Sequence, residues 1–120
     1  MATVVTNKGK DIAIARIIAG AGLYIAWGTG TGTAAVADTG LATEAAEGRV
    51  AATVTQVTTT TANDTLQAVG TLQASANRNI TNAGLFDSLT GGNLIMKGDF
   101  TAVPLNSGDS IAFTMRLQLT

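Results

Sequence analysis

A strict alternation of apolar and polar residues near the end of the chain is the feature that most constrains its fold. Over residues 111–120, Ile, Phe, Met, Leu and Leu occupy the odd positions, while Ala, Thr, Arg, Gln and Thr occupy the even ones. Successive side chains of a β-strand point to opposite faces. The pattern therefore predicts a strand with one face on an apolar core and the other toward solvent or a partner.

The same period of two runs through the rest of the second half. Turn-forming residues fill segments 58–64, 87–93 and 104–109, which separate the alternating runs. The predicted strands are residues 50–55, 65–73, 80–86, 94–100 and 111–119, and the first two form a hairpin. We expect an all-β fold, an antiparallel β-sandwich with a jelly-roll-like arrangement.

The N-terminal part follows a different period. Ile14, Ile17 and Ile18 recur at helical spacing, Asn7 is a suitable N-cap, and Asp11 near the first turn favours the helix dipole. Glycines at positions 20 and 22 end the predicted helix. The alternative is a buried β segment, since isoleucine also favours strands. Residues 1–22 are thus predicted to be an N-terminal arm and short helix, within a single domain spanning residues 1–120.

Residues 23–48 connect the predicted helix to the alternating strands. Residues 23–28 are a strand candidate in which Trp27 is core and Tyr24 lies at the core rim. Residues 28–33 (GTGTGT) are predicted to be a flexible surface loop. Residues 34–48, with Leu41 as their large apolar anchor, are a loop with room for one helical turn.

Composition excludes several classes of function. The chain has no His and no Cys, which removes the commonest general base, the commonest metal ligand and any thiolate. The seven Lys and Arg residues are scattered, so no basic stripe could follow a nucleic acid. The most apolar stretch, residues 12–27, is interrupted by Arg16 and glycines, and no targeting signal precedes it. We expect no enzyme activity, no cofactor, no metal, no nucleic acid and no membrane among its partners, and synthesis in a cytoplasm.

The GTGTGT run does not meet the requirements of a phosphate-binding loop. Such a loop needs Lys and Ser or Thr after its last glycine, and here Ala34 and Ala35 follow the run. The carboxylates show no calcium-loop spacing, and Asp64, Asp87 and Asp109 fall in predicted turns, where Asp bonds to the backbone.

Several motifs carry a family resemblance. They are YIAWGTGTG at residues 24–32, ITNAGLFD at 80–87, GGNLI at 91–95, DF at 99–100 and LNSGDSI at 105–111. Together they resemble a family of small tailed-phage structural proteins, of the head-decoration (cement) or tail-fibre-like kind. The resemblance covers most of the chain and implies a β-sandwich virion protein, with no catalytic residues to carry over. The GLFD…GGNL…GD pattern also occurs in larger tail-fibre and baseplate proteins.

From these features we expect a capsid decoration protein on the outer surface of a phage shell. Its partners would be the major capsid protein and further copies of this chain, which would form a trimer. A chain with only 12% charged residues is suited to lasting contacts with other proteins. The alternatives are a tail-fibre or baseplate module, which could bind host glycans, and a lectin-like or enzymatic domain unrelated to virions. The candidate partner contacts lie outside the alternating core pattern and are Thr3, Val4, Val5, Thr29, Thr31 and Thr33.

Overall fold

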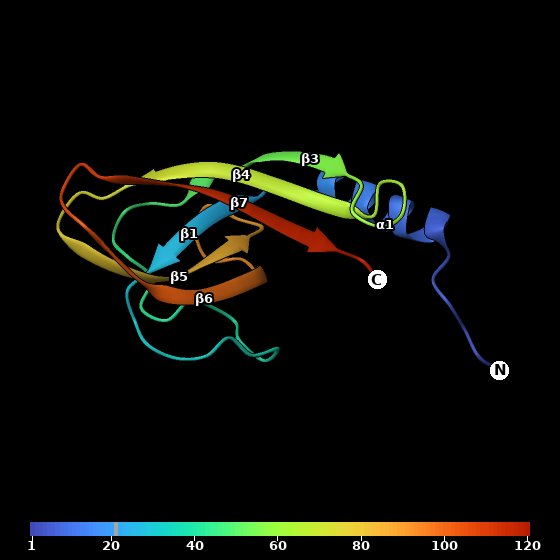
Figure 1. Ribbon diagram of the computed structural model, residues 1–120, viewed down its shortest axis with the longest axis horizontal. Coiled ribbons are helices and arrows are strands. Elements are labelled where there is room, and N and C mark those ends of the chain that lie inside the picture. The colour runs from blue at the N-terminus through green and yellow to red at the C-terminus, as the bar shows by residue number, and fades with distance from the viewer. Residues whose placement is uncertain (21) are drawn as a thin grey trace.

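The chain folds into one N-terminal helix followed by β-strands (Figure 1). The computed structural model describes residues 1–20 and 22–120, so Ala21, inside the predicted N-terminal segment 1–22, lies outside the described residues. The elements are α1 (Asn7–Ala19), β1 (Tyr24–Gly28), β2 (Val50–Ala51), β3 (Thr53–Val57), β4 (Thr65–Gln73), β5 (Arg78–Phe86), β6 (Leu94–Leu105) and β7 (Ser110–Gln118).

The strands form two antiparallel sheets, which confirms the predicted all-β sandwich with a short N-terminal helix. One sheet has the order β2-β1-β5-β6 and the other the order β3-β4-β7. Seven strands in sheets of four and three are fewer than the eight strands of a complete jelly roll. The predicted hairpin is β3–β4, in which Val54 pairs with Ala68.

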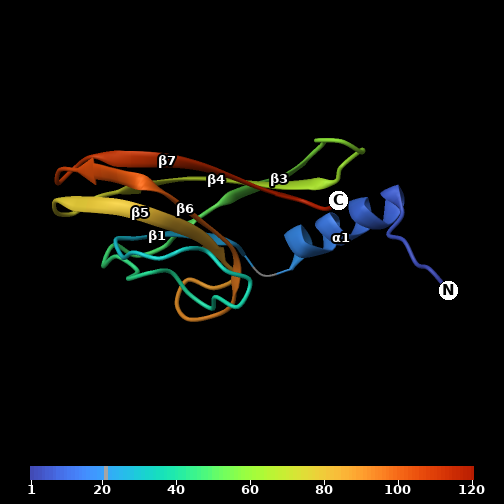
Figure 2. The same cartoon turned by 60° about the horizontal axis from the view of Figure 1, so that its bottom comes forward.

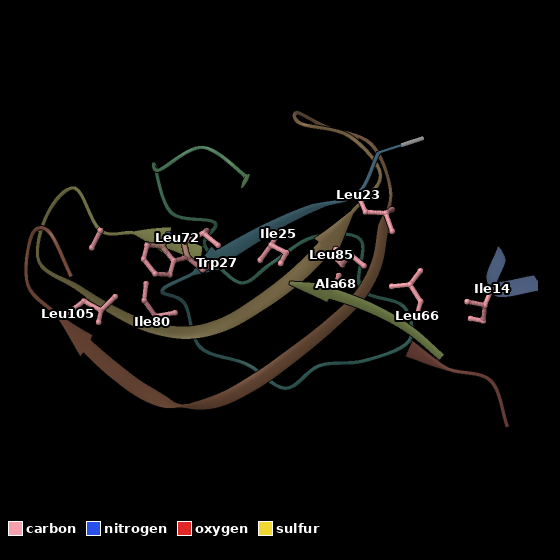
Figure 3. Close-up of a cluster of buried hydrophobic side chains, with 11 residues drawn as sticks. Ile14, Leu23, Ile25, Trp27, Leu66, Ala68, Leu72, Ile80, Leu85 and Leu105 are labelled. Atoms are coloured by element: carbon pink, nitrogen blue, oxygen red, sulfur yellow. The ribbon is translucent and has the colours of Figure 1, made fainter. Parts of the chain in front are cut away.

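The hydrophobic core lies between the two sheets (Figure 3). Ile25 and Trp27 of β1 and Leu85 of β5 face Leu66 and Leu72 of β4, and all five are buried. The period-two alternation thus places one face of each central strand in the core, as predicted. Trp27 is 1% exposed and Tyr24 is half-buried, which confirms their predicted core and rim positions.

One side of the sandwich is closed by a segment that both sheets share. β2 pairs with β1 in the first sheet, and after Ala52 the chain continues as β3, which pairs with β4 in the second sheet. The amide of Ala52 still donates to the carbonyl of Leu23 at this crossing. The predicted strand 50–55 is therefore two short strands, because it turns from one sheet to the other.

The helix begins one residue earlier than predicted. Thr6 is the N-cap, since its Oγ1 accepts a hydrogen bond from the amide of Gly9 at 3.0 Å, and Asn7 is already helical. Asp11 lies beyond the first turn, so its predicted interaction with the helix dipole is wrong. Its carboxylate instead accepts from Lys8 and from Gln56 of β3, which fastens the helix to the second sheet.

The helix covers one end of the sandwich. Ile14 is fully buried, and Ile17 and Ile18 pack against the core, as the helical spacing predicted. Gly20 ends the helix, and its amide bonds back to the carbonyl of Ile17. The alternative β segment is therefore wrong.

The long connection after β1, residues 29–49, packs against the four-stranded sheet. Gly28 bridges to Glu44, and the amides of Thr29 and Gly30 donate to the carbonyls of Thr43 and Ala42. The buried Asn82 of β5 exchanges hydrogen bonds with Ala42. Residues 34–48 form no helix; they contain turns at 36–37 and 42–43, the first closed by the hydrogen bond from the amide of Asp38 to the carbonyl of Ala35.

Arg49 and Glu47 hold the end of this connection. Arg49 binds Glu44 at 2.9 Å, donates to the carbonyls of Ser88 and Gly91, and stacks 3.6 Å above the ring of Phe86. Glu47 accepts hydrogen bonds from the indole of Trp27, from Ser75 and from Arg78. Burial alone would raise the pKa of Glu47, but the hydrogen bonds from Ser75 and Arg78 outweigh it and lower that pKa to about 2.

The GLFD, GGN and SGD motifs are explained by two turns. Asp87 accepts from the amide and side chain of Asn93, while Gly91 and Gly92 adopt positive φ angles in the turn between β5 and β6. Asp109 accepts from the amide of Asn106 in the turn between β6 and β7, where Gly108 also has positive φ. These motifs therefore build turns, which confirms the predicted turn role of Asp87 and Asp109.

Strand β6 is longer than predicted and ends at Leu105, so Pro104 belongs to the strand and not to the turn. Proline is tolerated there because β6 is an edge strand, where one side of the backbone needs no partner.

Gly84 is a position where a larger residue should destabilise the protein. A Cβ at Gly84 would lie 2.8 Å from Leu41 Cδ2 and 3.1 Å from the carbonyl oxygen of Met96. We expect Gly84→Ala to lower the free energy of unfolding by about 1–3 kcal/mol, measured by urea denaturation. The matched control is Gly98→Ala in β6, where a Cβ meets nothing within 4 Å and stability should be kept. Equal effects of the two substitutions would contradict the packing of Leu41 on Gly84.

Glu47 should make stability depend on pH. Because its pKa falls from 4.5 to about 2 on folding, its contribution is full above pH 4.5 and is lost as the pH falls toward 2. Glu47→Gln removes charged hydrogen bonds and should cost about 1.5–3 kcal/mol at neutral pH. Urea unfolding followed by Trp27 fluorescence should show the difference between wild type and variant shrinking on acidification; a difference independent of pH would contradict the role of the carboxylate.

Candidate interaction surface

The side of the sandwich opposite the shared segment is open. Strands β6 and β7 are edge strands of different sheets, and the turn over residues 106–109 connects them (Figures 1 and 2). Among the described residues, no strand pairs with the outer edge of β6 or of β7. Free strand edges carry unpaired backbone donors and acceptors, which makes them sites for adding another strand.

An apolar cleft of about 290 Å³ lies between these two edges. It is lined by Met96 and Phe100 from β6 and by Phe113 and Met115 from β7, with Ala83 of β5 beside them. Lys97 and Arg116 border it, but Lys97 binds Asp38 at 3.0 Å and Arg116 donates to Gln67. The cleft is therefore a hydrophobic surface whose charged neighbours are already paired.

A row of aromatic rings connects the cleft to the core. Trp27 is buried, Phe113 is half-buried and packs edge-on against it at 6.4 Å, and Phe100 lies 6.3 Å from Phe113. Phe100 is 37% exposed, so the row begins in the core and ends at the surface. Aromatic side chains that are partly exposed beside a cleft are typical anchors for protein partners.

The apolar face of β7 is only half-buried along its length. Ile111, Phe113, Met115 and Leu117 all pack against the core without being covered by it. The sequence predicted this face correctly but not its exposure, because the alternation is the same whether a second sheet covers a strand fully or in part. The cleft therefore has no signature in the sequence.

The candidate contacts from the sequence fall in two separate places. Thr3, Val4 and Val5 lie in the arm before α1, and Val4 and Val5 are 85% and 64% exposed. In Figures 1 and 2 this arm projects from the end of the molecule beyond the helix.

The three threonines of the glycine run lie against the four-stranded sheet. Thr29 is half-buried and hydrogen-bonded to Thr43, whereas Thr31 and Thr33 are exposed. Thr31 borders a hollow of about 190 Å³ that it shares with Phe100, so this loop reaches the rim of the open side. Gly28 and Gly30 pack so closely against Ala42 that a Cβ at either position would clash with its backbone. Only the second half of the run is therefore an exposed loop.

Each of the eight carboxylates has a hydrogen-bond partner within the chain. Asp64 is the most deeply buried, and the amides of Thr59, Thr60 and Thr61 bond to it and keep its pKa well below the usual range. The other carboxylates and their partners are Asp11 with Gln56, Asp38 with Ala35, Glu44 with Arg49, Glu47 with Ser75, Asp87 with Asn93, Asp99 with Ala34 and Asp109 with Asn106. These groups hold loops and turns in place.

The helix α1 is too short and too polar to cross a bilayer, and no other described segment forms a helix that could.

Comparison with known families identifies the kind of protein. A family model described as "Podophage GP4 fiber I protein gp80" matches residues 7–120, which is nearly the whole chain. The chain belongs to this family. As a member of the gp80 fibre family it is a phage structural protein and a virion component, as the motif resemblance implied. The match begins at the first residue of α1, so the exposed arm of this family member lies outside it. A comparison with curated proteins found no match.

The two phenylalanines of the cleft should respond differently to substitution. Phe100→Ser changes an exposed side chain and should alter the free energy of unfolding by less than about 1 kcal/mol. Phe113→Ala removes a half-buried ring that contacts Trp27 and should cost about 2 kcal/mol, less than a fully buried Phe. Both should reduce binding of an apolar fluorescent dye. Unfolding curves and dye titration would check this, and a large loss of stability in Phe100→Ser would show that the cleft is closed in solution.

Proposed function

We propose that this chain is a non-enzymatic structural subunit of the fibre of a podophage particle, which holds its neighbours through the open side of its sandwich. The observation that carries the proposal is the family match over residues 7–120, whose description is that of a podophage fibre protein. The apolar cleft between β6 and β7 supplies a surface suited to protein contacts.

The fibre assignment is supported better than capsid decoration, which the sequence first suggested. Both assignments need a compact, sparsely charged sandwich that binds proteins, and the physical features of this chain suit either. The description of the family favours the fibre. Binding to the major capsid protein has no separate support.

The hydrogen bonds that the carboxylates accept within the chain support a role without catalysis. All eight bond to groups of the same chain, which hold turns and loops, and the sequence contains neither His nor Cys. A catalytic acid or base has to face a substrate, and side chains engaged in this way would have to leave their partners first.

Self-association is part of the proposal. An interface between two different surfaces of one chain closes into a ring, such as a trimer, when its rotation allows. A chain with 12% charged residues and a net charge of −1 offers little electrostatic repulsion between copies.

Copy number and position in the particle test the fibre assignment. Quantitative mass spectrometry of purified virions should find a small number of copies relative to the major shell protein, and antibody labelling in electron micrographs should mark the tail. A ratio near one-to-one, with label over the shell, would support decoration instead. Absence from purified virions would contradict any structural role in the particle.

A further inference from the structure

The open side of the sandwich has room for an extended peptide segment, and its lining residues indicate which side chains that segment should carry. A strand added beside β7 would pair with its free backbone edge, and every second side chain would enter the cleft beside Phe113 and Met115. The opposite side chains would lie beside Ala112 and Thr114, which are small and uncharged; the next residue on that face, Arg116, is bonded to Gln67. The occupant should therefore be a short, uncharged strand with an apolar residue facing the cleft.

The edge of β7 is more accessible than that of β6. The loop over residues 30–38 lies against β6, where the amide of Ala34 bonds to Asp99 and Lys97 binds Asp38. Along the middle of β7, from Ala112 to Met115, the only backbone pairing in the described chain is with β4. A new strand is thus most easily accommodated at β7.

The chain itself contains a segment of this chemistry. Residues 2–6 (ATVVT) have no charge, are rich in β-branched residues that favour strands, and are exposed throughout. Thr6 already has extended backbone angles, φ −71° and ψ 162°. Five residues span at most about 18 Å, the length of an ordinary strand and less than that of β7.

The arm is directed away from its own cleft. Its last residue, Thr6, is fixed as the N-cap of α1, and α1 is anchored by the buried Ile14 and by the bond between Asp11 and Gln56. From this point the arm leaves the end of the molecule, away from the sandwich (Figures 1 and 2). Val4 is 85% exposed and has no cover within its own chain.

We infer that residues 2–6 of one copy add as a strand to the free edge of β7 in a second copy and place Val4 in the cleft beside Phe113. This inference deepens the proposed function, on which it rests for its biological setting. The arm and the β7 edge are different surfaces, so the contact runs head to tail from copy to copy. It covers Val4 and the half-buried face of β7, while Thr3 and Val5 lie on the outer face of the sheet.

Cross-linking between two full-length variants tests the contact directly. The chain has no cysteine, so a tagged Thr3→Cys copy and an untagged Thr114→Cys copy each carry a single thiol. With Val4 in the cleft, Thr3 lies on the outer face beside Thr114. A short bis-maleimide should therefore link the two variants when they are mixed. The matched control is Thr53→Cys, because Thr53 and Thr114 both pair with Val69 and lie in one row at opposite edges of the sheet.

The expected result is a strong link from Thr3 to Thr114 and little to Thr53. Equal linking to both positions would overturn the proposal. A chain that carries both Thr3→Cys and Thr114→Cys should link between molecules, and closure within one molecule would show that the arm covers its own cleft.

Light scattering gives a second, independent measurement. The wild type should have a mass above the 12.1 kDa of one chain, and Val4→Asp with Val5→Asp should return it to that mass. Val36→Asp is the control, since Val36 is even more exposed than Val4 and Val5 but lies in a loop, and it should leave the assembly unchanged. A monomeric wild type, or an assembly that persists in the arm variant, would overturn the inference. These outcomes concern the purified protein and are independent of where the protein lies in the particle, so failure here is distinguishable from failure of the fibre assignment.

Discussion

The segment from Val50 to Val57, which belongs to both sheets, determines the shape of the rest of the molecule. Because it pairs with β1 before Ala52 and with β4 after it, the two sheets are held together along one side and can diverge along the other. The core is deepest near the middle, where Trp27, Ile25 and Leu66 are buried. Toward β6 and β7 the same core becomes progressively exposed, and the aromatic row from Trp27 to Phe100 follows this gradient.

The outer faces of the two sheets differ, and this difference explains much of the chain's low content of charged residues. The connection 29–49 covers the four-stranded sheet and is fastened by Asn82, Arg49 and Glu47. The outer face of the three-stranded sheet carries Thr53, Val69 and Thr114 in one row, and in the next row Arg116 bonds to Gln67. The few charged groups are used mainly to bond loops and turns, which leaves a surface with little charge for partners to overcome.

The motifs that resemble phage structural proteins act through the fold. Gly84 allows Leu41 to approach the sheet, Phe86 supports Arg49, and Asp87 organises the turn that contains Gly91 and Gly92. A pattern of this kind preserves the sandwich and its covering loop, and through Ala83 and Phe100 it also contributes to the lining of the cleft.

The sequence by itself determined the elements of this protein, because local periodicity and turn chemistry are properties of neighbouring residues. The alternation in residues 111–119 and the spacing of Ile14, Ile17 and Ile18 predicted a strand and a helix that the structure confirms. It also determined the turn roles of Asp64, Asp87 and Asp109. Only the tertiary structure decided that Glu47 meets Trp27 and Arg78, that Pro104 is tolerated at an edge, and that the apolar face of β7 stays half-exposed. Those features depend on which strands become neighbours across the two sheets, and pairings between distant segments leave no periodic trace in a single sequence.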